Sequence, residues 1–142
     1  MEQTPPQEPA KPKQPNINDY VAGAMLANGV VWVWMQTLPI FIKSTDQLIV
    51  AAIAEFSWVI FIFGGYISSR QVCKRADEKH LLVGLKLAVV SWVMGIFIMF
   101  TLAPMPDARL MVALLICFAA GGVLGGYMTV RARLRKRRQA SS

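Results

Sequence analysis

The chain has 142 residues, of which 55% belong to the hydrophobic set and only 16% are charged, and its formal net charge is +7. Soluble domains carry about 25% charged residues, so this composition is typical of a membrane protein. It excludes a disordered chain, which has too few apolar residues, and a disulfide scaffold, which needs more than the two cysteines present.

The first nineteen residues are polar and rich in proline, and we predict a disordered cytoplasmic tail over residues 1–19. Pro6, Pro9, Pro12 and Pro15 recur at a spacing of three, which is the period of a polyproline II helix. The alternative is therefore an extended rod that binds an aromatic groove.

Four apolar stretches follow, each long enough to cross a hydrocarbon core of about 30 Å as a helix. They comprise residues 20–42, 47–69, 81–103 and 109–130, which together form a membrane domain over 20–130. Their hydrophobicity is continuous, which favours helices over the alternating strands of a membrane barrel. Because the connections are short, we predict an all-α, integral membrane four-helix bundle with antiparallel neighbours.

The distribution of basic residues predicts the orientation of the bundle. Of the fifteen Lys and Arg residues, twelve lie in the two tails and in the connection between the second and third stretches. Lys43 and Arg109 lie at the opposite ends of the stretches, and Lys86 lies inside the third. Cytoplasmic loops carry the excess of Lys and Arg. We therefore expect both termini in the cytoplasm and the chain in the cell inner membrane.

Residues 131–142 form a basic cytoplasmic tail, for which we expect contact with anionic lipid headgroups of the bilayer at about 1 kcal/mol per basic residue. The residues that carry this expectation are Arg131, Arg133, Arg135, Lys136, Arg137 and Arg138. No aromatic residue interrupts the run to stack on bases, so we expect no nucleic-acid partner.

The second and fourth stretches end in the same motif, GGYxxxR. Its residues are Gly64, Gly65, Tyr66 and Arg70 in the first copy and Gly125, Gly126, Tyr127 and Arg131 in the second. The offset of 61 residues predicts two tandem helical hairpins of the same orientation. Paired hairpins with this ending resemble small four-pass bacterial membrane proteins of unassigned activity. The resemblance spans residues 20–131 and implies a fold without implying a chemistry.

Small residues predict where the helices pack closely. In the third stretch they fall within one narrow arc, and in the fourth they form two overlapping GxxxG pairs, Gly121/Gly125 and Gly122/Gly126. The residues of the third stretch are Gly84, Ala88 and Gly95. Such faces let helix backbones approach one another in lipid.

Polar residues inside the stretches are the candidate functional residues: Glu55, Gln36 and Asn28. Glu55 lies about 12 Å from the outer end of the second stretch, and Gln36 comes level with it when the first two stretches fold together. We predict a structural hydrogen bond between Gln36 and Glu55. The alternative is that Glu55 carries a proton or binds a cation.

No catalytic or metal-binding constellation is evident. The single histidine, His80, lies in a charged loop without a nearby Cys or a second His, so we expect no enzyme activity, metal or cofactor. The leading hypothesis is a structural or accessory membrane protein that packs as a homo-oligomer or within a larger membrane complex. The alternatives are a small proton- or cation-coupled transporter that uses Glu55 and a holin-like pore former.

Overall fold

The structure is a computed structural model that describes residues 11–43, 46–102, 105 and 107–140. Its helices are α1 (Ile17–Ile42), α2 (Gln47–Cys73), α3 (His80–Leu102) and α4 (Ala108–Ala140). No strand occurs in this part of the chain, and all four helices are long and apolar enough to cross a membrane. The prediction of an all-helical chain with four candidate spans is therefore confirmed.

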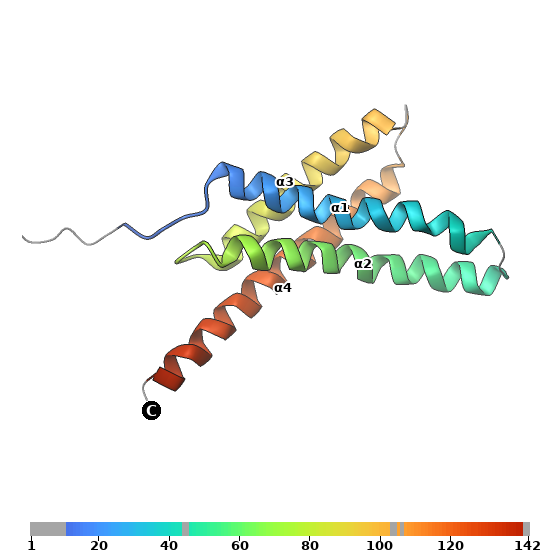
Figure 1. Ribbon diagram of the computed structural model, residues 1–142. Helices are drawn as coiled ribbons and strands as arrows, with labels where there is room; N and C mark the ends of the chain where they lie inside the picture. Colours follow the sequence, from blue (N-terminus) through green and yellow to red (C-terminus); the bar gives the residue numbers. More distant parts are fainter. Residues whose placement is uncertain (1–10, 44–45, 103–104, 106, 141–142) are drawn as a thin grey trace, which may run out of the picture.

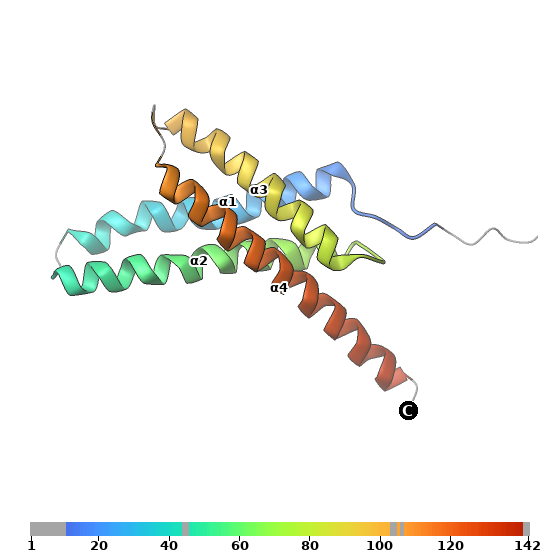
Figure 2. The ribbon, with the colours of Figure 1, turned by 180° about the vertical axis from the view of Figure 1, so that it is seen from behind.

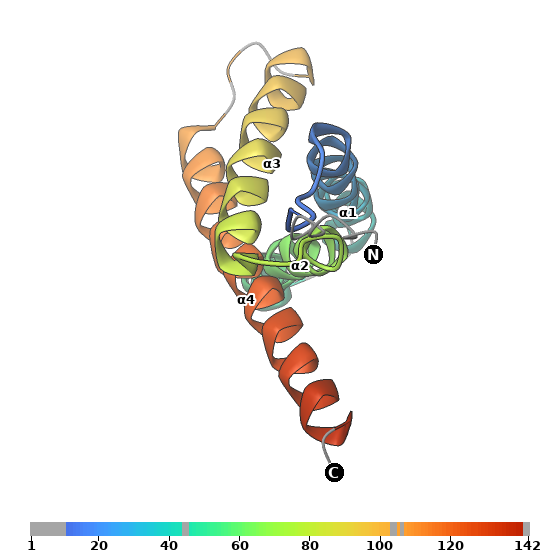
Figure 3. The same ribbon diagram turned by 90° about the vertical axis from the view of Figure 1, so that its left-hand side faces the viewer.

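The helices form two layers. Helices α1 and α2 lie side by side and antiparallel, and the antiparallel α3 and α4 cross them obliquely (Figures 1 and 2). Figure 3, which looks almost along α1 and α2, separates the two layers. The most extensive contact is that of α4 with α2, followed by that of α4 with α3. Helix α4 therefore holds the two layers together.

A buried core lies along the crossing of the layers. Its main cluster consists of Ala27, Val31, Phe61, Ala88, Leu114, Cys117 and Phe118. A second cluster lies where α2 ends and α3 begins, and consists of Val72, Cys73, Ala76, Val83 and Leu87. In the most apolar 18-residue segment of each helix, at most 39% of the residues are buried. The large apolar side chains on the outside form the surface that a bilayer would cover.

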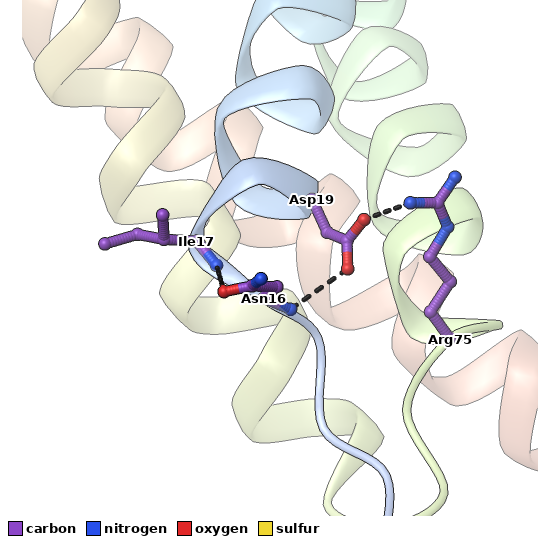
Figure 4. A network of polar contacts seen from close by, with 4 residues as sticks. All are labelled: Asn16, Ile17, Asp19 and Arg75. Carbon is purple, nitrogen blue, oxygen red and sulfur yellow. Dashed lines mark hydrogen bonds and ion pairs between the residues drawn. The ribbon is translucent and has the colours of Figure 1, made fainter.

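Helix α1 begins three residues before the predicted stretch because Asn16 caps it. The Asn16 side-chain oxygen accepts a hydrogen bond from the Ile17 N–H, and the Asp19 carboxylate accepts one from the Asn16 N–H (Figure 4). Such reciprocal bonds satisfy donors that a helix start leaves unpaired. Residues 11–16 have no regular structure, and residues 1–10 of the predicted tail lie outside the described residues.

Helix α4 continues through Ala140 without a break, for 33 residues in all. Most of the predicted basic tail is therefore a helical extension of the last span. Beyond the end of α2 and the start of α3 this extension projects away from the other helices (Figures 1 and 3).

Candidate functional site

Asn28, one of the predicted intramembrane polar residues, is buried where α1 crosses α3. Its side-chain Nδ2 donates to the Ala24 carbonyl one turn earlier and to the Ser91 carbonyl on α3, both at 2.9 Å. Gly95 lies against the amide oxygen, because a Cβ at Gly95 would be 2.8 Å from Asn28 Oδ1. Asn28 therefore joins two helices through their backbones, which is a structural role.

The predicted hydrogen bond between Gln36 and Glu55 is absent from the structure. The polar contact between α1 and α2 at this level is instead the bond from Trp34 Nε1 to Ser57 Oγ, at 2.8 Å. Gln36 follows Trp34 by two residues and Glu55 precedes Ser57 by two, and two residues turn a helix by about 200°. The prediction matched the depths of Gln36 and Glu55 but ignored this rotation.

The rotation sends the two side chains to different surroundings. Gln36 is exposed on α1 and lines a cleft between α1, α3 and α4, together with Asn28 and Gly95. Glu55 is exposed on the outer face of α2, where it has no hydrogen bond or ion pair with any residue that the structure describes. Glu55 therefore faces away from the interior of the bundle.

Two apolar clefts open between the layers, near the C-terminal ends of α1 and α3. One has a volume of about 340 Å³ and lies between the α1–α2 layer and the start of α4, with Asp107 and Arg109 among its lining residues. The other is the cleft lined by Gln36, with a volume of about 160 Å³. Glu55 lines neither cleft. Their mainly apolar walls fit hydrocarbon chains better than a small ion.

The two GxxxG pairs of α4 face different helices. The pair Gly121/Gly125 lies on α2, where a Cβ at Gly125 would be 2.8 Å from the Tyr66 carbonyl oxygen. The pair Gly122/Gly126 lies on α3, where a Cβ at Gly122 would be 2.6 Å from the Gly84 carbonyl oxygen. Backbone atoms on a facing helix cannot rotate aside as a side chain can, so these glycines fix the distance between the helices.

Gly84 and Ala88 contribute the α3 side of this packing. Gly84 lies against the Gly122 carbonyl, and the Ala88 methyl group is 3.4 Å from a Cβ placed at Gly122. Ser69 on α2 adds a hydrogen bond from its hydroxyl to the same Gly122 carbonyl, at 2.7 Å. Three helices therefore meet at Gly122.

The glycines that correspond in the two GGYxxxR copies make different contacts. Gly64 lies against α1, at Ala27 and Val30, whereas Gly125 lies against α2. Gly65 lies against α4, at Phe118, whereas Gly126 lies against the start of α3. The two copies are thus used differently in packing, although both lie where α2 and α4 leave the apolar region.

Arg133, which we expected on lipid headgroups, contacts the protein instead. Its guanidinium donates to the carbonyls of Ala76, Asp77 and Lys74, at 2.7, 3.1 and 3.3 Å. These carbonyls follow or end α2, where helices leave acceptors unpaired. The Asp77 carboxylate and N–H also bond the backbone of Lys13, so Arg133 and the N-terminal segment fix one loop from two sides.

Asp19 and Arg75 form an ion pair between the start of α1 and the segment after α2 (Figure 4). Asp19 precedes the predicted stretch 20–42, and the Asn16 N–H, which donates to its carboxylate, lowers its pKa below the ordinary value of 3.8. Arg75 lowers the pKa further. The pair therefore remains ionised at neutral pH.

His80 is not part of the exposed charged loop in which the sequence suggested it. It is the first residue of α3 and is buried, and its carbonyl accepts a hydrogen bond from the Cys73 thiol at 3.2 Å. Among the residues described, no three His, Cys, Asp or Glu side chains are grouped so that they could hold a metal ion.

The remaining members of the predicted set are at the surface. Arg135, Lys136 and Arg137 are exposed on the extension of α4, as is Arg131. Tyr127 is half-exposed, whereas Tyr66, Arg70 and Arg131 line one groove between α2 and α4. No family model, curated protein or solved structure matches the chain. The resemblance to small four-pass bacterial proteins therefore stays a prediction.

Proposed function

We propose that the chain is a structural or accessory protein of the cell inner membrane that associates with a second copy of itself. It consists of two tandem hairpins with both termini in the cytoplasm. The excess of Lys and Arg in the tails and in the connection between α2 and α3 supports this orientation. The interhelical contacts of Asn28, Trp34, Ser69 and Gly122 support a structural role, because the polar side chains among them bond other parts of the same bundle.

The observation that carries the proposal is the exposed carboxyl group of Glu55. It lies about 12 Å along α2 from Gln47, and so well inside a span of about 30 Å. An acidic side chain in the middle of a membrane helix costs about 2.5–3.5 kcal/mol on insertion scales. A partner that offers a hydrogen bond at this depth would offset part of that cost.

A second copy of the chain satisfies this requirement by symmetry. Two copies with the same orientation place their Glu55 side chains at the same depth, and a two-fold interface brings the same face of each copy together. Ala51 and Ala52 lie one turn away and are exposed, so they allow two α2 helices to approach closely. One protonated carboxyl group could then donate to the other.

The test is the mass of the purified full chain in a mild detergent, measured by light scattering. We expect a dimer or a higher oligomer for the parent chain and a monomer for Glu55→Leu. Glu55→Gln should keep the oligomer, because its amide still forms hydrogen bonds between helices. The control is Lys86→Leu, which removes the exposed charge from α3. A monomeric parent chain, or an unchanged mass for Glu55→Leu, would contradict the proposal.

The alternative of proton- or cation-coupled transport makes a different demand on the same residue. Because Glu55 is exposed on α2 and lines neither of the two clefts described above, a transport path that uses Glu55 would run between copies. In that case Glu55→Gln should abolish a pH-dependent flux in proteoliposomes while leaving the oligomer intact. If the parent chain carries no flux of protons or cations, the structural proposal is favoured.

A further inference from the structure

A groove lies between the cytoplasmic ends of α2 and α4, at the point where both helices leave the apolar region. It has a volume of about 370 Å³ and is lined by Tyr66, Arg70, Met128, Arg131, Ala132 and Arg135. Tyr66 and Arg70 come from the first GGYxxxR motif, and Arg131 is the arginine of the second. The fold therefore brings the polar ends of the two motifs into one site.

The groove carries three positive charges without an acidic residue in its lining. The only ion pair found among the described residues joins Arg75 to Asp19 and lies elsewhere. Arg131 and Arg135 are four residues apart on one face of α4, where like charges repel each other. An anion in the groove would relieve this repulsion.

The donors suit a phosphate group in particular. Guanidinium groups are planar forks that bind two phosphate oxygens at once. The Tyr66 hydroxyl oxygen accepts a hydrogen bond from Arg70 Nη1 at 3.3 Å. Its own proton remains available to a third phosphate oxygen. The groove thus presents donors and offers no carboxylate that would repel an anion.

The position of the groove points to a phosphate that is attached to a lipid. Arg70 and Arg131 each lie one residue beyond the predicted stretches 47–69 and 109–130, whereas Tyr66 and Met128 lie within them. The groove therefore crosses the expected boundary between hydrocarbon and headgroups. Met128 and Ala132 give it an apolar side that a soluble anion would not need.

We propose that this groove binds the headgroup phosphate of one anionic phospholipid per chain. Such a site differs from a general attraction of the basic segment to the membrane. Arg133 lies on another face of α4 and is bonded to loop carbonyls, so only part of the basic run faces the groove. The proposal rests on the membrane placement proposed above and does not depend on self-association through Glu55.

The experiment compares two double variants that remove the same charge from the same helical segment. R131Q/R135Q removes both α4 arginines from the groove, and K136Q/R137Q removes two exposed charges outside it. The full chain is extracted from nanodiscs of equal parts phosphatidylglycerol and phosphatidylcholine, and retained lipid is counted by native mass spectrometry. Each variant is first checked for an unchanged helix content and a single elution peak.

We expect the parent chain to retain one phosphatidylglycerol, and K136Q/R137Q to match it. R131Q/R135Q should lose about tenfold or more in retention, as should R70Q on the other helix, because bonds to charged groups are lost. Tyr66→Phe removes only the hydroxyl proton donor and decides the matter if an arginine variant fails to fold. Equal losses in the two double variants, or full retention in both R70Q and Tyr66→Phe, would overturn the site.

Inorganic phosphate distinguishes the two sources of the anion. Added to the detergent-extracted chain, it should displace phosphatidylglycerol only weakly if the lipid is the ligand, since it lacks the apolar contact with Met128. Complete displacement of phosphatidylglycerol by inorganic phosphate would assign the groove to free phosphate and contradict the lipid proposal. The Glu55→Leu variant keeps the two proposals apart. We expect it to lose the oligomer and to retain phosphatidylglycerol, because the lipid site does not depend on self-association.

Discussion

Adding one methyl group to Gly122 tests the packing of α4 on α3. A Cβ at Gly122 would lie 2.6 Å from the Gly84 carbonyl oxygen, whereas an ordinary contact begins at 3.4 Å. The two backbones must therefore separate by roughly 0.8 Å, or the helices must rotate. Overpacking of this kind costs about 1–3 kcal/mol. The Ser69 hydroxyl donates a hydrogen bond to the Gly122 carbonyl, and loss of such a bond in a membrane adds about 0.6 kcal/mol.

We therefore expect Gly122→Ala to lower the free energy of unfolding by about 2–4 kcal/mol. The measurement is unfolding by dodecyl sulfate in mixed micelles, followed by tryptophan fluorescence. The matched control is Gly29→Ala on α1, where a Cβ would meet nothing within 4 Å. If the two variants unfold at the same dodecyl sulfate fraction, the close approach of α3 and α4 at Gly122 does not exist in the folded protein.

Three further predictions concern the polar contacts. Arg133→Gln should speed hydrogen exchange in the loop after α2, at a cost of about 1–2 kcal/mol. Arg137→Gln should leave the exchange unchanged, and equal exchange rates in the two variants would mean that Arg133 does not hold the loop after α2. Asn28→Ala should cost about 1–2 kcal/mol in the same dodecyl sulfate titration, and no loss would mean that α1 does not depend on this bridge. Because the folded pKa of Asp19 is lowered, its stabilising effect is present above the unfolded value of 3.8 and is lost as pH falls through the lower folded value. Asp19→Asn should remove that acid-dependent step in a thermal melt, and a step that persists would place its origin in another group.

Hydropathy predicted the number and approximate limits of the helices because a bilayer demands long apolar segments whatever their packing. It did not predict the ends that polar contacts determine. Asn16 extends α1 backward through its capping bonds, and α4 continues through Ala140 in a sequence that is no longer apolar. The capping signal is visible in the sequence, since Asp19 follows Asn16 by three residues.

The candidate site was harder to predict because depth along a helix and direction around it are separate quantities. Counting residues from the turn gives the depth of Gln36 and Glu55 correctly, but the direction depends on which side of α1 faces α2. Trp34 and Ser57 settle that direction through their hydrogen bond. A sequence that holds polar residues on both faces of a helix does not say which face lies inside.

The same periodicity explains how α4 serves two purposes near its C-terminal end. From Gly121 and Gly125, steps of three and four residues along α4 lead through Met128 and Ala132 to Arg135, so the stripe that packs on α2 ends in the groove. From Gly122 and Gly126 the same steps lead through Thr129 to Arg133, so the stripe that packs on α3 ends on the loop carbonyls. The two glycine pairs differ by one residue, or about 100° around the helix. This single step separates the arginine that holds the protein's own loop from those that remain free to bind a lipid phosphate.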